Sequence, residues 1–104
     1  MNLCGILSIN NSLSYLDLSL NFLSGEIPDC WKYGHNLIAL NLADDNLTGQ
    51  IPNSMGQLIH LNTLRLENND LLGEVPLSLK NCTELTVLYL ADNRLSGNIT
   101  NMDW

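Results

Sequence analysis

The sequence predicts an α/β solenoid, in which stacked units of equal length wind into a right-handed superhelix with a short parallel β-sheet on the concave face. The main observation is a segment that begins at Leu13 and returns at Leu37, Leu61 and Leu85, an interval of 24 residues each time. Equal periods of this length are typical of units that bury their apolar edges against neighbouring units. We therefore expect one array over residues 1–104, with a partial unit (1–12), three units (13–36, 37–60 and 61–84), a second partial unit (85–104) and no caps.

The leucines at the start of each unit predict a short strand. Successive side chains of a strand point to opposite faces. In the first copy, one face of the strand therefore carries Leu13, Leu16 and Leu18. The other face carries Tyr15, Asp17 and Ser19. The equivalent strands fall at residues 39–43, 63–67 and 87–91. Because every unit repeats the same direction and register, the strands should form a parallel sheet.

A polar side chain follows each strand at the same place in the unit, and these residues are Asn21, Asp45, Asn69 and Asn93. An asparagine amide both donates and accepts hydrogen bonds, so a stacked ladder of them can satisfy the backbone groups that the turning chain leaves open. An ionised carboxylate can only accept. We therefore expect a local defect at Asp45.

Glycine and proline mark the second half of each unit. Glycine suits a sharp bend, and proline after a β-branched residue holds the chain extended. Glycines recur at positions 25, 49, 73 and 97 and prolines at 28, 52 and 76, with Thr100 where a fourth proline would stand.

Behind each proline, the return along the convex side has buried positions at about helical spacing. The pairs at these positions are Trp31 and Gly34, Met55 and Leu58, and Leu79 and Cys82. We expect Trp31 to be a core residue whose ring fills the space that Gly34 leaves.

Composition narrows the function classes. The net charge is −7, and the basic residues, which form no cluster, are Lys32, Arg65, Lys80 and Arg94. Both facts argue against a nucleic-acid partner, and we take the acidity mainly as an aid to solubility. No apolar run approaches the roughly 18 residues that cross a bilayer, so we expect no membrane contact by this segment, and no targeting signal is visible.

The three cysteines favour structural roles. Cys82 aligns with Leu58 and should be a small buried hydrophobe. Cys4 and Cys30 fall at nearly equivalent places in adjacent units, but the sequence leaves open whether they form a disulfide. His35 and His60 stand at no metal-ligand spacing from the cysteines, so we predict neither a metal site nor a cofactor.

The repeated pattern LxxLxLxxNxLxGxIP resembles the plant-specific class of leucine-rich repeats over Leu7 to Ile99. The runs LSGEIPDCW, from Leu23, and LKNCTELTVLYLADNRLSGNI, from Leu79, are similar to the ectodomains of plant receptor-like proteins of the xylanase-receptor and fungal-resistance type. The resemblance implies an extracellular array, normally of more units, anchored by one transmembrane helix in the plasma membrane and signalling through partner kinases.

Specificity should reside in the outward side chains of the strands, because their residue types vary while packing constrains the leucines. The middle outward position holds Asp17, Asn41, Arg65 and Tyr89. Tyr and Arg often anchor protein contacts, although Arg65 and Glu67 could simply pair with each other as solvated surface. The predicted ligand-binding residues are Tyr15, Asp17, Asn41, Arg65, Glu67 and Tyr89.

Four Asn-x-Ser/Thr sequons predict glycan acceptors at Asn10, Asn46, Asn81 and Asn98. Asn10 ranks last, because its position is buried in the other units. No catalytic arrangement of side chains and no phosphate-binding loop is suggested by local spacing.

We therefore predict a non-enzymatic module that recognises a peptide or protein, as part of a plant cell-surface receptor-like protein in defence or development, with a co-receptor kinase as a second partner. The alternatives are a soluble inhibitor similar to polygalacturonase inhibitors and a truncated repeat fragment without independent activity.

Overall fold

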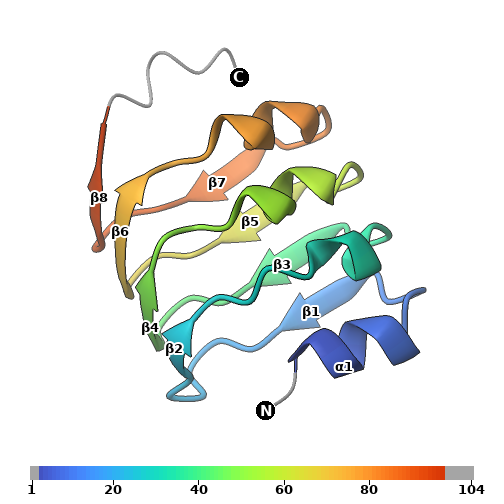
Figure 1. Ribbon diagram of the computed structural model, residues 1–104, viewed down its shortest axis with the longest axis horizontal. Helices are drawn as coiled ribbons and strands as arrows, with labels where there is room; N and C mark the ends of the chain where they lie inside the picture. The colour runs from blue at the N-terminus through green and yellow to red at the C-terminus, as the bar shows by residue number, and fades with distance from the viewer. Residues whose placement is uncertain (1–2, 98–104) are drawn as a thin grey trace.

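The computed structural model describes residues 3–97, which form a stack of similar coils (Figure 1). One short helix, α1, spans Leu3–Ile9 at the start of this region. Each coil that follows contributes one strand to each of two parallel sheets, with a 3-10 helix between successive coils. No helix among the described residues is both long and apolar enough to cross a membrane.

The first sheet confirms the predicted parallel arrangement and its register. Its strands, in spatial order, are β1 (Tyr15–Asp17), β3 (Ala39–Asn41), β5 (Thr63–Arg65) and β7 (Val87–Tyr89). Tyr15 lies opposite Ala39, Ala39 opposite Thr63, and Thr63 opposite Val87. Equivalent residues of successive units are therefore direct neighbours.

The strands are shorter than predicted, at three residues each. Shortly after its strand, each coil contains a residue with a left-handed backbone, such as Asp44 at φ 57° or Asn68 at φ 58°. A positive φ breaks the extended backbone that a ladder needs. Hydrogen bonds between coils nevertheless continue to this point, since Asp44 N donates to Glu67 O at 3.0 Å.

A second parallel sheet, which the sequence analysis did not anticipate, forms from the segments around the repeated glycines. Its strands, in spatial order, are β2 (Ser24–Glu26), β4 (Asn46–Gly49), β6 (Asp70–Glu74) and β8 (Arg94–Ser96). The glycine bends are confirmed, because Gly25, Gly49, Gly73 and Gly97 all have φ between 76° and 82°. The register differs from that of the first sheet: Ser24 pairs with Asn46, 22 residues later.

The core is a strip of leucines between the two sheets and the convex side. Leu40 and Leu64 of the first sheet are fully buried, whereas Leu16 and Leu88 at its two edges are only partly buried. Burial of each such side chain contributes roughly 1.5–3 kcal/mol. The fully buried leucines are Leu7, Leu37, Leu40, Leu42, Leu58, Leu61, Leu64, Leu66, Leu71 and Leu79.

The convex side consists of 3-10 helices η1 (Trp31–Gly34), η2 (Asn53–Gln57) and η3 (Leu77–Asn81). Trp31 is fully buried, as predicted. The space beside Gly34 is filled differently than expected. A Cβ there would first meet Leu37, Leu7 and Leu58, at 3.2 to 3.5 Å, so leucines from the units before and after take the place assigned to the Trp31 ring.

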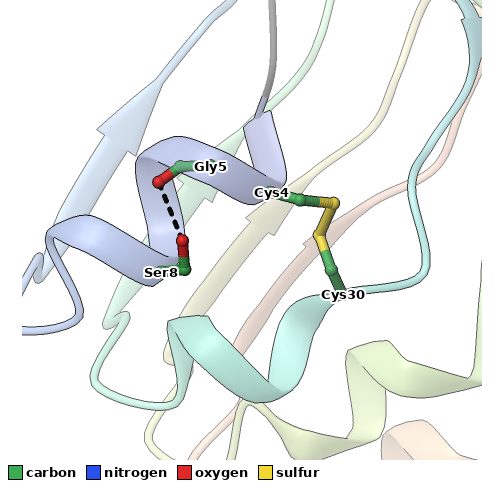
Figure 2. The surroundings of a disulfide bond; sticks show 4 residues. All are labelled: Cys4, Gly5, Ser8 and Cys30. Atoms are coloured by element: carbon green, nitrogen blue, oxygen red, sulfur yellow. Dashed lines mark hydrogen bonds between the residues drawn. A yellow bond between two sulfur atoms is a disulfide. The ribbon is translucent and has the colours of Figure 1, made fainter.

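A disulfide joins Cys4 of α1 to Cys30, just before η1, with the two Cα atoms 5.8 Å apart (Figure 2). Sequence alone left this pair undecided. In α1, Ser8 Oγ also donates to Gly5 O at 3.1 Å. The third cysteine, Cys82, is buried as predicted. It forms no disulfide among the described residues, and burial raises the pKa of its thiol.

The asparagine ladder is present at Asn69 and Asn93. Asn69 Oδ1 accepts from Leu47 N, and its Nδ2 donates to Leu42 O, 2.9 Å away in the preceding coil. Asp45 is buried as well. Its Oδ2 is enclosed without a hydrogen-bond partner among the described residues. This is the local defect that the sequence predicts.

Candidate ligand-binding face

The concave face is formed by the side chains of β1, β3, β5 and β7 that point away from the leucine core. The register places Asp17, Asn41, Arg65 and Tyr89 in one row across the four strands. This row follows directly from the equal length of the units. A ligand crossing the strands would therefore meet one residue from every unit in turn.

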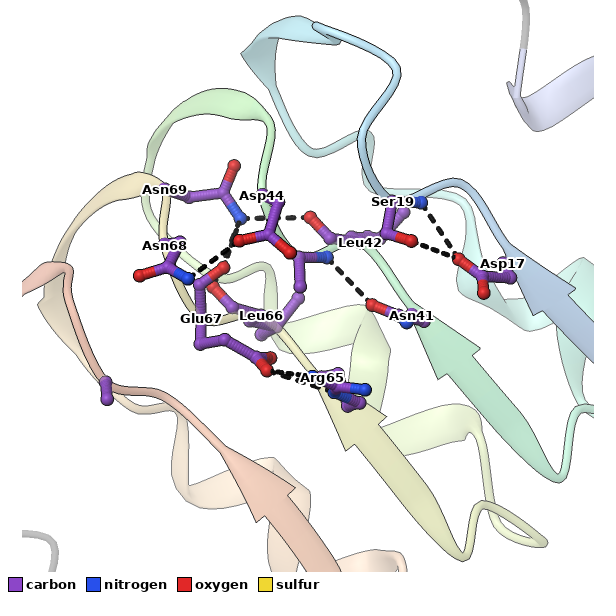
Figure 3. Close-up of polar contacts among 12 residues, drawn as sticks. Asp17, Ser19, Asn41, Leu42, Asp44, Arg65, Leu66, Glu67, Asn68 and Asn69 are labelled. Carbon is purple, nitrogen blue, oxygen red and sulfur yellow. Dashed lines mark hydrogen bonds and ion pairs between the residues drawn. The ribbon is translucent and has the colours of Figure 1, made fainter.

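Arg65, Glu67 and Tyr89 make up one contact group. Arg65 Nε donates to Glu67 Oε2 at 3.0 Å (Figure 3). The guanidinium carbon lies 5.1 Å from the centre of the Tyr89 ring, in the geometry of a cation–π contact. The hydrogen bond to Glu67 is the main cause that raises the pKa of Arg65.

The contact group of Arg65, Glu67 and Tyr89 is held in place by its internal contacts and is still partly accessible to solvent. The Arg65 side chain is 40% exposed and that of Glu67 only 13%, while Tyr89 is half exposed. The expectation that Arg65 and Glu67 pair with each other is confirmed, but the pair is not ordinary solvated surface, because the tyrosine of the next coil covers it. Arg65 is thus held in place and still presents a planar cation to solvent.

Asp17 and Asn41 each bond within their own coil. Asp17 Oδ1 accepts from both the hydroxyl and the backbone N–H of Ser19, at 2.6 and 3.0 Å. The Ser19 hydroxyl is the main cause that lowers the pKa of Asp17. Asn41 Oδ1 accepts from Ala43 N at 3.0 Å. Both side chains therefore have set orientations.

Tyr15 stands apart from the other predicted residues. It lies on β1, where the residue is 67% exposed. The structure thus brings Arg65, Glu67 and Tyr89 into contact and leaves Tyr15 at the far edge of the same sheet. The concave face has two aromatic ends, with polar residues on the strands between them.

Sequence reasoning missed a second polar row beside this face, at the left-handed positions. Asn68 Nδ2 donates to Asp44 Oδ1 at 2.7 Å, which links two coils (Figure 3). A signal was present, because aspartate and asparagine tolerate positive φ better than most residues do. In the first unit this position holds Leu20, which is 72% exposed.

The sequons can now be placed. Asn46 and Asn81 are exposed, at the start of β4 and the end of η3. The position of Asn10 is buried in the other units, as expected, but Asn10 itself follows the end of α1 and is exposed as well. Its equivalents Leu58 and Cys82 are buried because they are apolar. Asn98 lies outside the described residues.

Within residues 3–97, no cluster of three or more histidine, cysteine, aspartate or glutamate side chains could hold a metal ion. His60 lies near one carboxylate, with Nδ1 3.2 Å from Glu84 Oε2, and both side chains are more than half exposed.

Comparison with known proteins gives the family. The model of the Leucine Rich Repeat family matches residues 12–33, 36–58, 60–82 and 84–102. The chain belongs to the leucine-rich repeat family. No curated protein sequence matches it.

Solved structures of plant receptor ectodomains share this fold. The receptor kinase HAESA of Arabidopsis, solved with the peptide hormone IDA and the co-receptor SERK1, is 47% identical with a TM-score of 0.83 over 90% of this chain and 15% of its own. The ectodomain of GASSHO1/SCHENGEN3 of Arabidopsis thaliana, solved with CASPARIAN STRIP INTEGRITY FACTOR 2, is 42% identical with a TM-score of 0.83 over 88% of this chain and 11% of its own. The BIR2 ectodomain of Arabidopsis thaliana is 36% identical with a TM-score of 0.84 over 88% of this chain and 48% of its own. The chain thus spans less than half the length of each of these three ectodomains.

Proposed function

We propose that this chain is a non-enzymatic recognition module on the extracellular side of a plant cell, which binds a secreted peptide or protein through its concave face. The observation that carries the proposal is the row of fixed polar and aromatic side chains across four strands, from Asp17 to Tyr89. The similar ectodomains of HAESA, solved with the peptide hormone IDA, and of GASSHO1/SCHENGEN3, solved with CASPARIAN STRIP INTEGRITY FACTOR 2, support it.

The setting that we propose is the ectodomain of a receptor-like protein in defence or developmental signalling, with a receptor kinase as its signalling partner. Resemblance to the receptor-like class rests on the runs that begin at Leu23 and Leu79. The disulfide between Cys4 and Cys30 suits an oxidising compartment such as the cell exterior. The structure of HAESA with SERK1 supports a kinase partner.

The chemistry of the concave face suggests how a peptide would bind. The Arg65 guanidinium offers donors in one plane, which match a carboxylate or a peptide carbonyl. Tyr89 and Tyr15 offer large faces with little conformational entropy to lose on binding. An extended peptide across the strands would meet Tyr15, the polar row and then Tyr89.

The test is a binding titration of the full chain with a panel of candidate ligands that includes the peptide hormone IDA and CASPARIAN STRIP INTEGRITY FACTOR 2. We expect at least one of these ligands to bind, and the triple variant Tyr15→Ala, Arg65→Ala, Tyr89→Ala to weaken binding by about a hundredfold or more, since anchor residues typically contribute roughly 1–2 kcal/mol or more each.

A matched control changes three exposed residues of the convex side, Lys32→Ala, Gln57→Ala and Lys80→Ala. This control should bind as the unchanged chain does. Equal loss in both triple variants, or no loss in the concave variant, would reject the concave face as the binding surface.

A further inference from the structure

Phe22 is an exposed aromatic residue in an ordered loop. The residue is 84% exposed, and its backbone is left-handed with φ 55°. The loop is held by Asp45, whose Oδ1 accepts from both Asn21 N and Leu23 N at 3.0 Å. At the equivalent place in the next coil, Asn69 Oδ1 accepts from Leu47 N. The carboxylate therefore fixes the loop that presents the ring.

The neighbouring strand begins with a glycosylation sequon. Asn46 is the first residue of β4, is exposed, and is followed by Leu47 and Thr48. Asn46 N donates to Leu23 O at 2.7 Å, and Ser24 pairs with Asn46 in the second sheet. Phe22 lies two residues before Ser24. Phe22 also directly precedes Leu23, so its backbone lies beside that of Asn46, within the reach of an aromatic ring and a sugar.

We propose that Asn46 carries an N-linked glycan and that its first sugar, an N-acetylglucosamine, covers the ring of Phe22. One face of a pyranose ring exposes mainly C–H groups, and an aromatic ring is a large flat apolar partner. Contact between them removes apolar surface of both from water. The glycan thus covers an aromatic ring that the described protein residues leave exposed to solvent.

The proposal rests on the extracellular location given under the proposed function, and it is independent of ligand binding. Asn81 provides an internal comparison, because it is also an exposed sequon residue, on η3 and outside the second sheet. A glycan at Asn81 would stand on the convex side, two coils after the one that holds Phe22. It should not alter the surroundings of that ring.

The experiment uses the full chain secreted from plant cells, with peptide mass spectrometry to measure the occupancy of Asn46. Limited digestion with chymotrypsin then reports access to the bond after Phe22. We expect cleavage there to be about fivefold faster in Asn46→Gln than in the glycosylated chain, the change that a modest loss of local protection produces. Asn81→Gln should cleave after Phe22 at the rate of the unchanged chain.

Thr48→Ser keeps the sequon and Thr48→Ala removes it, so only the second variant should behave like Asn46→Gln. Thermal melting adds a second readout: Phe22→Ala should lower the Tm of the glycosylated chain more than that of Asn46→Gln. An unmodified Asn46, or equal cleavage with and without the glycan, would overturn the proposal. A chain that binds no peptide but shows the cleavage difference would overturn only the proposed function.

Discussion

Asp45 and Asn69 occupy equivalent positions in their units but form hydrogen bonds with different backbone groups. The Asn69 amide nitrogen donates to the carbonyl oxygens of Leu42, Leu66 and Glu67, and its oxygen accepts from Leu47 N. Asp45 keeps the acceptor half of this pattern and gains a second donor, Asn21 N. Its Oδ2 stands in place of the amide nitrogen and is buried without a partner. A buried polar atom of this kind reduces stability.

Replacing Asp45 by asparagine should therefore stabilise the fold. Asparagine keeps the accepting oxygen and adds a donor toward the carbonyl oxygens of its own turn. We expect a gain of about 1 kcal/mol, which raises Tm by roughly 4–8 °C in a domain of this size, measured by circular dichroism at pH 7. The reverse change, Asn69→Asp, should lower Tm. An unchanged or lower midpoint for Asp45→Asn would contradict this account.

Ser19 controls the ionisation of Asp17. Its hydroxyl and N–H bond the ionised carboxylate, so the pKa of Asp17 lies below the ordinary 3.8. This contribution to stability is complete above the unfolded pKa and is lost as the pH falls through the lowered folded pKa. In Ser19→Ala, which removes the largest cause, an NMR titration of Asp17 should give a higher pKa than in the unchanged chain. A pKa that stays the same would show that the hydroxyl has no such role.

At the scale of the elements, the convex helices η2 and η3 pack closely because Gly56 has no side chain. A Cβ at Gly56 would overlap the backbone of Ser78 and approach its Cβ to 2.7 Å. Ser78 Oγ also donates to Asn53 O at 2.8 Å and ties the two helices together. The glycine is needed for close approach, since its φ lies outside the left-handed region.

Two glycine variants separate close approach from backbone conformation. Gly56→Ala should destabilise the chain by about 2–3 kcal/mol, because the two helices must move apart. Gly25→Ala meets no atom within 4 Å, so it should cost only the roughly 1–2 kcal/mol of a left-handed alanine. Urea unfolding of both variants would measure the difference. A larger loss of stability in Gly25→Ala than in Gly56→Ala would mean that the packing between η2 and η3 can relax.

For the molecule as a whole, the 24-residue period was enough to predict the first sheet, its register and most of the core. It could not predict the second sheet, because segments such as Ser24–Glu26 are short, contain a glycine and lack the apolar alternation that marks a strand. The left-handed Phe22 was also out of reach, since it depends on hydrogen bonds to Asp45 in the next coil. The disulfide required the geometry of α1 against η1, and the Arg65–Tyr89 contact required the register between coils.

Stability should differ along the array, because a unit is supported only by its neighbours. Leu64 is fully buried between two strands, whereas the equivalent Leu16 is only partly buried. We expect Leu64→Ala to cost about 3 kcal/mol and Leu16→Ala clearly less, by urea unfolding. Equal losses would indicate that all units are packed alike.

The register of the second sheet has a consequence for shape. Its partners are 22 residues apart, while those of the first sheet are 24 apart. Within β4, the residues that pair with β2 and those that pair with β6 are accordingly displaced by about two positions, or roughly 6.6 Å of slide along the strand. The second sheet is thus displaced along its strands from each coil to the next, while the first sheet is not. In any array that continues both registers, each coil must be rotated relative to the coil before it. A long ligand that follows the concave face would have to twist along with the coils.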